Sequence, residues 1–411
     1  MFYNSPSPLI GITGTNGKTS TILMLKYILE YCGLNPAALD AYRGNLSFDR
    51  FMQSNSSQNN DYRLIEVPAE ALRQKQMNGE VFQVAALTNL STDHLASCHR
   101  PETYYAVKSV FFSTLPKEAR VVVNADDQRA LTLVRDDRHD FITYALHYPN
   151  AMIVAENITR SRFTSTFDIS VKTEIIDRAK QAVMPETVRV RLGMPGEQNI
   201  YNALLAASIA LLLQVGLKKI AEALGKFPGI RRNMELIAAD RFYVVDDGAC
   251  NRAAIRTALD AAETITDGNI LLLHGIYGGG GQEVNRCVAA ELAAWSLKTP
   301  HSRLFVTRSM YHCKHKYQVR LREEKAFLAE LKEKGADFAY YPDLPDAVDA
   351  VMQHAQRGDL VLLLGGHTMD KASDMVLRAG GELRAAQALM SSGIPGREPD
   401  PHVQPVSGNA T

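Results

Sequence analysis

The run of residues 9–20 constrains this chain most, because it joins a strand, a glycine-bearing turn and a helix within a few residues. Apolar Leu9, Ile10 and Ile12 predict the strand, and the apolar spacing of residues 23–31 predicts the helix. Glycines let backbone N–H groups close around phosphate oxygens, and a helix N-terminus favours negative charge. The run therefore predicts a phosphate-binding loop. Its residues are Gly14, Thr15, Asn16, Gly17, Lys18, Thr19 and Ser20.

Two side chains of this loop indicate its chemistry. Lys18 would reach the terminal phosphates of a nucleotide, and the Thr19 hydroxyl would ligate Mg²⁺. The general form of such a loop has a glycine five residues before Gly17, where this chain has Ile12. The alternative is a glycine-rich turn that binds nothing. The strand before the turn and the helix after it favour the phosphate-binding interpretation.

The rest of the chain predicts an α/β protein, because strand and helix signals alternate along its 411 residues. We expect a P-loop domain with a mostly parallel sheet and a small antiparallel β appendage over residues 1–230. A Rossmann-like domain over residues 231–391 should follow. Turn chemistry at residues 228–232 predicts a hinge about which the second domain closes on the first. The polar, Pro- and Gly-rich residues 392–411 are expected to form a disordered tail.

Composition excludes several classes of protein. Lys plus Arg and Asp plus Glu both total 45, so overall charge gives no reason to expect nucleic-acid or membrane binding. No apolar run approaches the roughly 20 residues of a membrane-spanning helix, and the N-terminus lacks a signal-peptide pattern. The five cysteines form no C-x-x-C pair, which argues against a zinc ribbon or a disulfide framework. A reducing cytoplasm is the expected location.

Three further residues are candidates for metal chemistry. Glu66 ends an apolar strand, where ligands bind in open α/β sheets, and could ligate Mg²⁺; the alternative is an acid that faces solvent. His94 follows Asp93 after another strand, and such a pair could bind a metal or phosphate, or could simply cap a helix or lie on the surface. Lys108 lies within an apolar helical segment, where composition alone predicts a surface lysine with a buried stem.

Taken in order, these segments resemble the Mur ligase superfamily of ATP-dependent amide-bond ligases. The loop matches the family's Gly-Thr-Asn-Gly-Lys-Thr, which explains the missing first glycine. Further matches are the strand acid Glu66, the Asn-x-x-x-Asp-His-Leu of residues 89–95, the Asn-x-Asp-Asp of residues 124–127 and the signature of residues 196–204. The family's Tyr-x-x-Ala-Lys helix is matched less closely, by Tyr104 or Tyr105 with Ala106 and Lys108.

The resemblance implies a reaction. ATP would phosphorylate a substrate carboxylate to an acyl phosphate, and an amine would then attack it, releasing phosphate and leaving ADP. Small-molecule carboxylate and amine substrates are implied, the amine being an amino acid, but the sequence names neither. Two rivals remain: a nucleotide-binding subunit that has lost ligase activity, and a plain ATPase or kinase.

The resemblance also assigns roles to residues. Lys18 and the loop amides would hold ATP, Thr19 and Glu66 one Mg²⁺, and His94 with a carbamylated Lys108 a second Mg²⁺. Lys18, His94 and Lys108 would be the catalytic residues. For the nucleotide, Asn199 would contact adenine with support from Asn202, Asp247 would contact the ribose, and Arg232 would contact the phosphates.

The second half departs more from the family pattern. Cys250 stands at a family histidine, either as a structural thiol or as a nucleophile, and Asn233 stands at a family arginine. Glycines 278–281 suit either a ligand-binding or a flexible loop. The basic residues 308–316 suit an anionic substrate, a solvated surface or, with His312 and His315, a metal. Because the chain opens at the loop strand, we expect no preceding domain for a uridine-diphosphate sugar.

Overall fold

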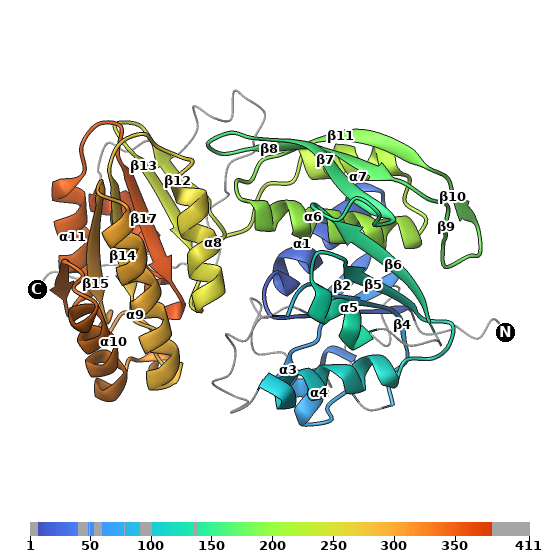
Figure 1. The fold of residues 1–411 in the computed structure, drawn as a ribbon, viewed down its shortest axis with the longest axis horizontal. Helices are drawn as coiled ribbons and strands as arrows, with labels where there is room; N and C mark the ends of the chain where they lie inside the picture. Colours follow the sequence, from blue (N-terminus) through green and yellow to red (C-terminus); the bar gives the residue numbers. More distant parts are fainter. Residues whose placement is uncertain are drawn as a thin grey trace, which may run out of the picture.

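The computed structural model describes residues 7–39, 48, 50–52, 60–77, 79–90, 101–134 and 139–379, without the side chains of 101–104. These residues form two α/β bodies that lie side by side, each built around its own sheet (Figure 1). The residue pair 230/231, where we predicted the domain boundary, lies between the last helix of the first body and the first strand of the second. The predicted tail over residues 392–411 lies outside the described residues.

Within the described part of the chain, the first body has a nine-stranded sheet in the order β11-β8-β7-β6-β5-β4-β1-β3-β2. Strands β1 to β7 pair with one another in parallel. Strand β8 pairs antiparallel with both β7 and β11. The predicted antiparallel appendage is therefore an extension of the main sheet, with a separate β9-β10 ribbon. The bounds are β1 Leu9–Thr13, β2 Pro36–Leu39, β3 Tyr62–Glu66, β4 Phe82–Leu87, β5 Arg120–Asn124, β6 Asp140–Ala145, β7 Ile153–Arg160, β8 Ser165–Val171, β9 Ile175–Ile176, β10 Ala182–Val183 and β11 Glu186–Leu192.

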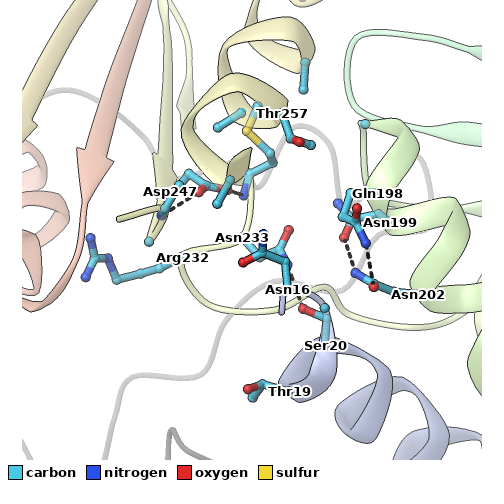
Figure 2. A pocket seen from close by; sticks show the side chains of 18 of the residues that line it. Asn16, Thr19, Ser20, Gln198, Asn199, Asn202, Arg232, Asn233, Asp247 and Thr257 are labelled. Carbon is cyan, nitrogen blue, oxygen red and sulfur yellow. Dashed lines mark hydrogen bonds between the residues drawn. The ribbon is translucent and has the colours of Figure 1, made fainter. Parts of the chain in front are cut away.

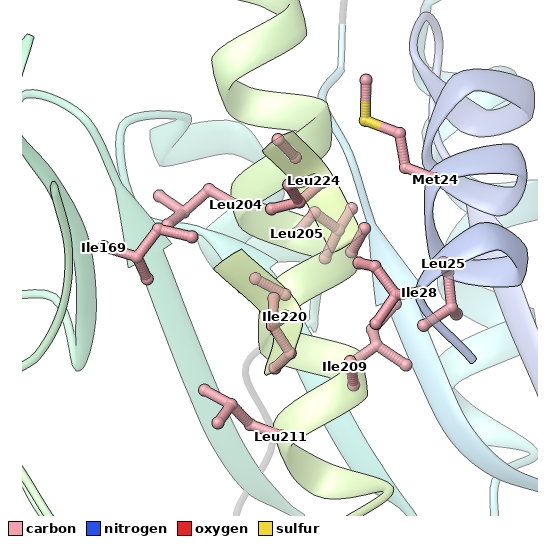
Figure 3. Close-up of a cluster of buried hydrophobic side chains, with 14 of the residues drawn as sticks. Met24, Leu25, Ile28, Ile169, Leu204, Leu205, Ile209, Leu211, Ile220 and Leu224 are labelled. Atoms are coloured by element: carbon pink, nitrogen blue, oxygen red, sulfur yellow. The ribbon is translucent and has the colours of Figure 1, made fainter. Parts of the chain in front are cut away.

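Helices cover both faces of this sheet. Alternate residues of β1 enter different cores: Ile10 and Ile12 pack with α1, α6 and α7, whereas Leu9 packs with α4. Helix α6 is apolar on nearly all sides because it is buried between α1 and the sheet extension (Figure 3). Each fully buried Leu or Ile there contributes about 1.5–3 kcal/mol. The bounds are α1 Lys18–Tyr31, α3 Ala69–Arg73, α4 Pro101–Ser113, α5 Gln128–Val134, α6 Glu197–Leu212 and α7 Leu217–Gly225.

The second body is a six-stranded sheet in the order β12-β13-β17-β14-β15-β16, parallel except at β12. Helices α8, α9 and α10 pack on one face, and α11 and α12 on the other. The predicted Rossmann-like arrangement is confirmed. The bounds are β12 Glu235–Ala239, β13 Tyr243–Asp247, α8 Arg252–Ala262, β14 Ile270–Gly275, α9 Gly281–Lys298, β15 Ser302–Thr307, η3 His315–Tyr317, α10 Leu321–Glu333, β16 Phe338–Tyr341, α11 Leu344–His354, β17 Leu360–Gly365, η4 His367–Met369 and α12 Ala372–Ala379.

The α/β fold class predicted from the sequence is confirmed in both bodies. The carboxyl ends of β1 and β3 lie side by side in the first sheet. Asp247, at the carboxyl end of β13, lies across from Thr19 and Ser20 at the start of α1 (Figure 2). None of the helices in the described ranges is long and apolar enough to cross a bilayer.

Candidate active site

A cavity of about 290 Å³ lies between the two bodies. From the first body it is lined by the P-loop, which we define as residues 14–20, and by the N-terminal end of α6. From the second body it is lined by residues 232–234, by residues 247–251 and by one face of α8 (Figure 2). Both domains therefore supply walls of the same cavity, as a site that closes around a nucleotide requires.

The two P-loop glycines are required by backbone geometry. Gly14 has a φ of +142°, and a Cβ there would lie 1.8 Å from the Thr88 hydroxyl. Gly17 has a φ of +84°, and a Cβ there would lie 2.3 Å from the Asn202 side-chain oxygen. A side chain at either position would meet both a left-handed backbone and a steric clash. The glycine spacing read from the sequence thus reflects close packing as well as phosphate chemistry.

Two residues that follow β4 hold the loop open. Asn89 accepts the N–H of Asn16 on its side-chain oxygen at 3.0 Å and returns a bond from its amide to the Asn16 carbonyl at 3.1 Å. The Thr88 hydroxyl donates to the same carbonyl at 2.7 Å. The sequence indicates a metal or phosphate role for residues 89–95 because they contain His94. The structure shows instead that the first residue of this motif shapes the P-loop, a role that only the fold reveals.

Lys18, Thr19 and Glu66 come together at the start of α1. The Thr19 hydroxyl donates to the Glu66 carboxylate at 2.6 Å, and the Lys18 ammonium lies 3.8 Å from that carboxylate. Lys18 also donates to the carbonyl of Thr15 at 2.9 Å. A hydroxyl beside a carboxylate is an oxygen donor set of the kind Mg²⁺ prefers. Glu66 does not simply face solvent, because its side chain is only 10% exposed.

Lys108 is fully buried, so the surface lysine that composition alone predicts is wrong. Its ammonium donates to the Thr13 hydroxyl at 2.9 Å and to the Gly14 carbonyl at 3.1 Å. The residue therefore lies directly behind the P-loop. His94 lies outside the described residues, and no cluster of three or more His, Cys, Asp or Glu side chains suited to a metal occurs within them.

The N-terminal end of α6 supplies the amide side chains of the cavity. Asn199 is 3% exposed, and its amide donates to the Pro195 carbonyl at 2.8 Å. Asn202 lies one turn further along and donates to the Asn199 side-chain oxygen at 3.5 Å. Asn202 therefore supports Asn199, in the arrangement that the resemblance implies, while it also packs against Gly17.

Asp247 ends β13 on the opposite wall. Its carboxylate accepts the N–H groups of Met234 and Ala249, each at 2.8 Å. Burial nevertheless raises the pKa of Asp247 to about 6. The carboxyl group thus lies at the cavity wall with remaining acceptor capacity for hydroxyl groups.

Arg232 points away from the cavity into its own domain (Figure 2). Its guanidinium bonds the buried Asp246 at 3.1 Å and Asp370 at 2.5 Å. It also donates to the carbonyls of Gly365 at 2.6 Å and Gly366 at 3.0 Å. A phosphate contact, which we predicted from the sequence, would require these buried bonds to break.

Two other unusual features of the second body, Cys250 and the glycine run 278–281, are packed into the fold. Burial raises the pKa of Cys250 to about 11, so its thiol stays protonated and is a poor nucleophile near neutral pH. In the glycine run, the N–H of Gly281 bonds Glu323 at 2.9 Å, and a Cβ on Gly278 would lie 1.9 Å from the Tyr317 carbonyl. The run is therefore packed against η3 rather than open.

Part of the basic segment 308–316 is neutralised. Arg308 bonds Glu324 at 2.8 Å, and His312 lies 3.0 Å from Asp343. His315 and the flanking Lys314 and Lys316 remain exposed. An anionic ligand would therefore meet these three residues before it met Arg308.

Comparison with known proteins assigns both bodies to one family. The family model for the Mur ligase middle domain matches residues 12–210, and the model for the Mur ligase, glutamate ligase domain matches residues 232–367. A curated relative is the UDP-N-acetylmuramoyl-L-alanyl-D-glutamate--2,6-diaminopimelate ligase of Bacillus licheniformis. It is 28% identical over 398 residues, covering 89% of this chain and 75% of the relative.

Solved structures agree on the fold. MurF from Acinetobacter baumannii superposes with a TM-score of 0.69 at 17% identity, over 91% of this chain and 77% of that one. The MurF ligase of Thermotoga maritima, solved in complex with ADP, gives a TM-score of 0.69 at 13% identity, over 92% and 80%. At these identities the likeness concerns the fold and not side-chain roles.

Proposed function

The chain belongs to the Mur ligase family of ATP-dependent, amide-bond-forming ligases, and from this premise we propose how its own residues carry out the reaction. A substrate carboxylate attacks the γ-phosphorus of ATP and displaces ADP, which gives an acyl phosphate. An amine then attacks the acyl carbon, phosphate leaves, and the nitrogen loses a proton. The observation that carries the proposal is the Thr19–Glu66 pair beside Lys18, at a cavity whose walls come from both domains.

Lys18 and the P-loop amides hold the β- and γ-phosphates. The first N–H groups of α1 have no acceptor within the helix, so they are available to phosphate oxygens. To meet a phosphate, the Lys18 ammonium would leave the Thr15 carbonyl at 2.9 Å and exchange its contact with Glu66 at 3.8 Å for one with the phosphate. A carboxylate and a triphosphate repel each other, and this positive charge offsets part of that repulsion before in-line attack.

Mg²⁺ fits the donor set of Thr19 and Glu66, because the hydroxyl and the carboxylate oxygen already lie 2.6 Å apart. A bound Mg²⁺ would neutralise charge on the phosphates. In the structure, the Thr19 hydroxyl donates a hydrogen bond to the Glu66 carboxylate. We propose His94 and Lys108 as the residues of a second metal position, on the strength of the family resemblance.

Carbamylation of Lys108 requires the side chain to move. The buried ammonium now donates to a hydroxyl and to the Gly14 carbonyl, whereas a carbamate would place negative charge against that carbonyl oxygen. We propose that the modified side chain leaves this position for the catalytic side of the P-loop. Carbon-13 NMR of protein equilibrated with labelled bicarbonate tests this: a carbamate signal that Lys108→Met removes supports the modification, and no signal in active protein overturns it.

The nucleoside binds between Asn199 and Asp247. Asn199 is proposed to contact the adenine, because the family resemblance gives it this role and because it is one of the buried amides at the α6 end of the cavity. Asp247 is proposed to accept the ribose hydroxyls with the lone pairs that its two backbone donors leave free. For Arg232 we propose a role at the phosphates only in a rearranged state, since its described bonds lie within the second domain.

The substrates are proposed by class. The Bacillus relative is named for joining 2,6-diaminopimelate to a UDP-N-acetylmuramoyl peptide. For this chain we propose a small-molecule carboxylate and an amino-acid amine. The exposed cations of η3 and its neighbours suit an amine substrate that also carries an anionic group. Dependence on ATP makes the cytoplasm the proposed location.

The decisive experiment is an ATP-consumption screen over candidate acids and amino acids, with mass spectrometry for condensation products that have lost water. We expect ADP and phosphate release that requires both substrates and Lys18. A phosphorylated product without an amide would favour a kinase, and ATP turnover that ignores the amine would favour an ATPase. Binding of ATP without turnover on any acid–amine pair would favour the regulatory-subunit alternative.

A further inference from the structure

Two side-chain amides of the second domain cross the cavity and bond the P-loop. The Asn251 amide donates to the side-chain oxygen of Asn16 at 2.9 Å. The Asn233 amide donates to the hydroxyl of Ser20 at 2.9 Å. Asn16 lies within the turn of the P-loop and Ser20 lies in the first turn of α1. Figure 2 shows Asn233, Asn16 and Ser20 gathered at the centre of the pocket. The second domain therefore holds the P-loop at two separate points.

The side chain of Asn251 is held by its own helix as well as by Asn16. Its side-chain oxygen accepts the N–H of Ala254 at 3.0 Å and so caps the N-terminus of α8. The residue is 5% exposed, and the cap leaves its amide group directed at Asn16. On the other side, Asn89 and Thr88 hold the backbone of Asn16. A continuous set of hydrogen bonds thus joins the end of β4 to the start of α8.

Asn233 is presented by an unusual backbone. The residues on either side of it, Arg232 and Met234, have φ values of +56° and +47°, in the left-handed region that side chains rarely adopt. The buried bonds of the Arg232 guanidinium and the bond from the Met234 N–H to Asp247 hold this backbone in place. The result is a tight turn whose central residue, Asn233, faces Ser20. Asn233 also stands where the family resemblance predicts an arginine, so this contact is a feature of this chain.

We propose that Asn233 and Asn251 form a two-point amide clasp on the P-loop that sets the closed arrangement of the two domains around the nucleotide. They are positioning residues: they act through Asn16 and Ser20 and touch no reacting atom. The clasp rests on the proposed function, since it matters only if a nucleotide binds in this cavity. Nucleotide exchange then requires both amide bonds to open, and their loss shifts the domains toward the open arrangement.

The expected effect follows from the strength of a neutral hydrogen bond. One such bond, formed in place of bonds to water, changes an equilibrium by about 2- to 10-fold. Loss of either amide should therefore weaken nucleotide binding by about 2- to 10-fold, and loss of both by about the product. A merely structural role would lower thermal stability without this change in binding.

The variants can be chosen to isolate the clasp. Asn251→Ser keeps a good cap for α8 but is too short to reach Asn16. Asn233→Ala removes the second donor. Arg162→Ala is the matched control, because Arg162 also crosses between the domains, to Tyr243 at 3.0 Å and Asp267 at 3.1 Å. Asp267 is 98% exposed, so this contact should contribute little.

The test measures binding of a non-hydrolysable ATP analogue by calorimetry and the radius of gyration without nucleotide by small-angle scattering. We expect weaker binding and a larger radius for Asn233→Ala, for Asn251→Ser and most of all for the double variant, with Arg162→Ala like the wild type. Wild-type affinity and radius in the double variant would overturn the clasp.

A double-mutant cycle covers the case in which Asn251→Ser does not fold. Once Ser20→Ala has removed the acceptor, Asn233→Ala should cost no further affinity, whereas fully additive losses would overturn the pairing. These measurements need no acid or amine. A protein that shows the predicted losses but forms no amide would contradict the proposed function alone, and an active ligase without these losses would contradict the clasp alone.

Discussion

The two walls of the cavity in which we propose that the nucleotide binds are built in different ways. On the P-loop side, local backbone geometry dominates: Gly17 leads directly into α1, and Thr19 meets Glu66 across adjacent parallel strands. On the opposite side, a buried charge network dominates. Arg232 there binds Asp246 and, 138 positions away in sequence, Asp370. On the first wall, one short stretch of chain carries most of the polar groups, and distant residues such as Asn89 and Glu66 hold that stretch in place. On the second wall, the polar groups themselves come from segments far apart in the chain.

The largest expected effect tests the second wall. Arg232→Met should lower the free energy of unfolding by about 3–5 kcal/mol, because it leaves the carboxylate of Asp246 buried without its partner. Urea denaturation measures this change, and Arg231→Met, at the exposed neighbouring position, should stay within about 0.5 kcal/mol of the wild type. An Arg232→Met protein of wild-type stability that had lost only ATP affinity would break the comparison, since Arg232 would then be a phosphate ligand.

The next effect tests the first wall. Lys18→Ala should lower kcat by about 10²–10³-fold while the protein keeps its stability, because it removes a positive charge directed at the transferred phosphate. Steady-state ADP release measures this. Lys26→Ala is the control on the same helix, since Lys26 pairs with Glu30 on the outer side of α1. A loss of activity explained by unfolding would show that Lys18 is structural, like Arg232.

Glu66→Gln should raise the Mg²⁺ concentration for half-maximal activity by about 10-fold or more, because the amide is a weaker ligand than the carboxylate. A magnesium titration at saturating ATP measures the shift. Glu70→Gln is the matched control, since Glu70 lies on α3 and pairs with Arg73 at the surface. An unchanged magnesium requirement would show that the Thr19–Glu66 contact is only a helix-start hydrogen bond.

The smallest effect concerns pH. Asp247 has a pKa raised to about 6 by burial, so its carboxylate is mostly ionised at pH 7 and mostly protonated at pH 5. Affinity for ADP should fall by up to about 10-fold over this range, because a protonated carboxyl is a poorer acceptor for ribose hydroxyls. The titration of ADP itself also changes the affinity with pH. In Asp247→Asn, only this contribution from ADP should remain. Identical profiles for the two proteins would contradict the ribose contact.

The same shift has a consequence for stability. A carboxyl whose pKa is raised in the folded state binds more protons folded than unfolded between about pH 4 and pH 6. This group therefore stabilises the fold below that window and loses its contribution as the pH rises through it.

Sequence reasoning could group the residues of the first wall because most of them are neighbours in the chain. Gly14, Gly17 and Thr19 lie within one turn and the start of one helix, so spacing alone brings them together. Glu66 could be placed because parallel strands end at the same edge of a sheet. Lys108 was misjudged from composition because burial depends on what packs around the helix, and here the P-loop carbonyl of Gly14 supplies its partner.

The α/β class, the strand–turn–helix segment of the P-loop and the family could all be predicted from the sequence alone. Each of these depends on periodicity, on glycine conformation or on motifs in a fixed order. Only the tertiary structure decided that Arg232 serves its own domain and that Asn89 shapes the P-loop, because these contacts join segments far apart in the chain. The same holds for Asn233 and Asn251, whose amides meet Ser20 and Asn16 only once two independently packed domains have been placed side by side.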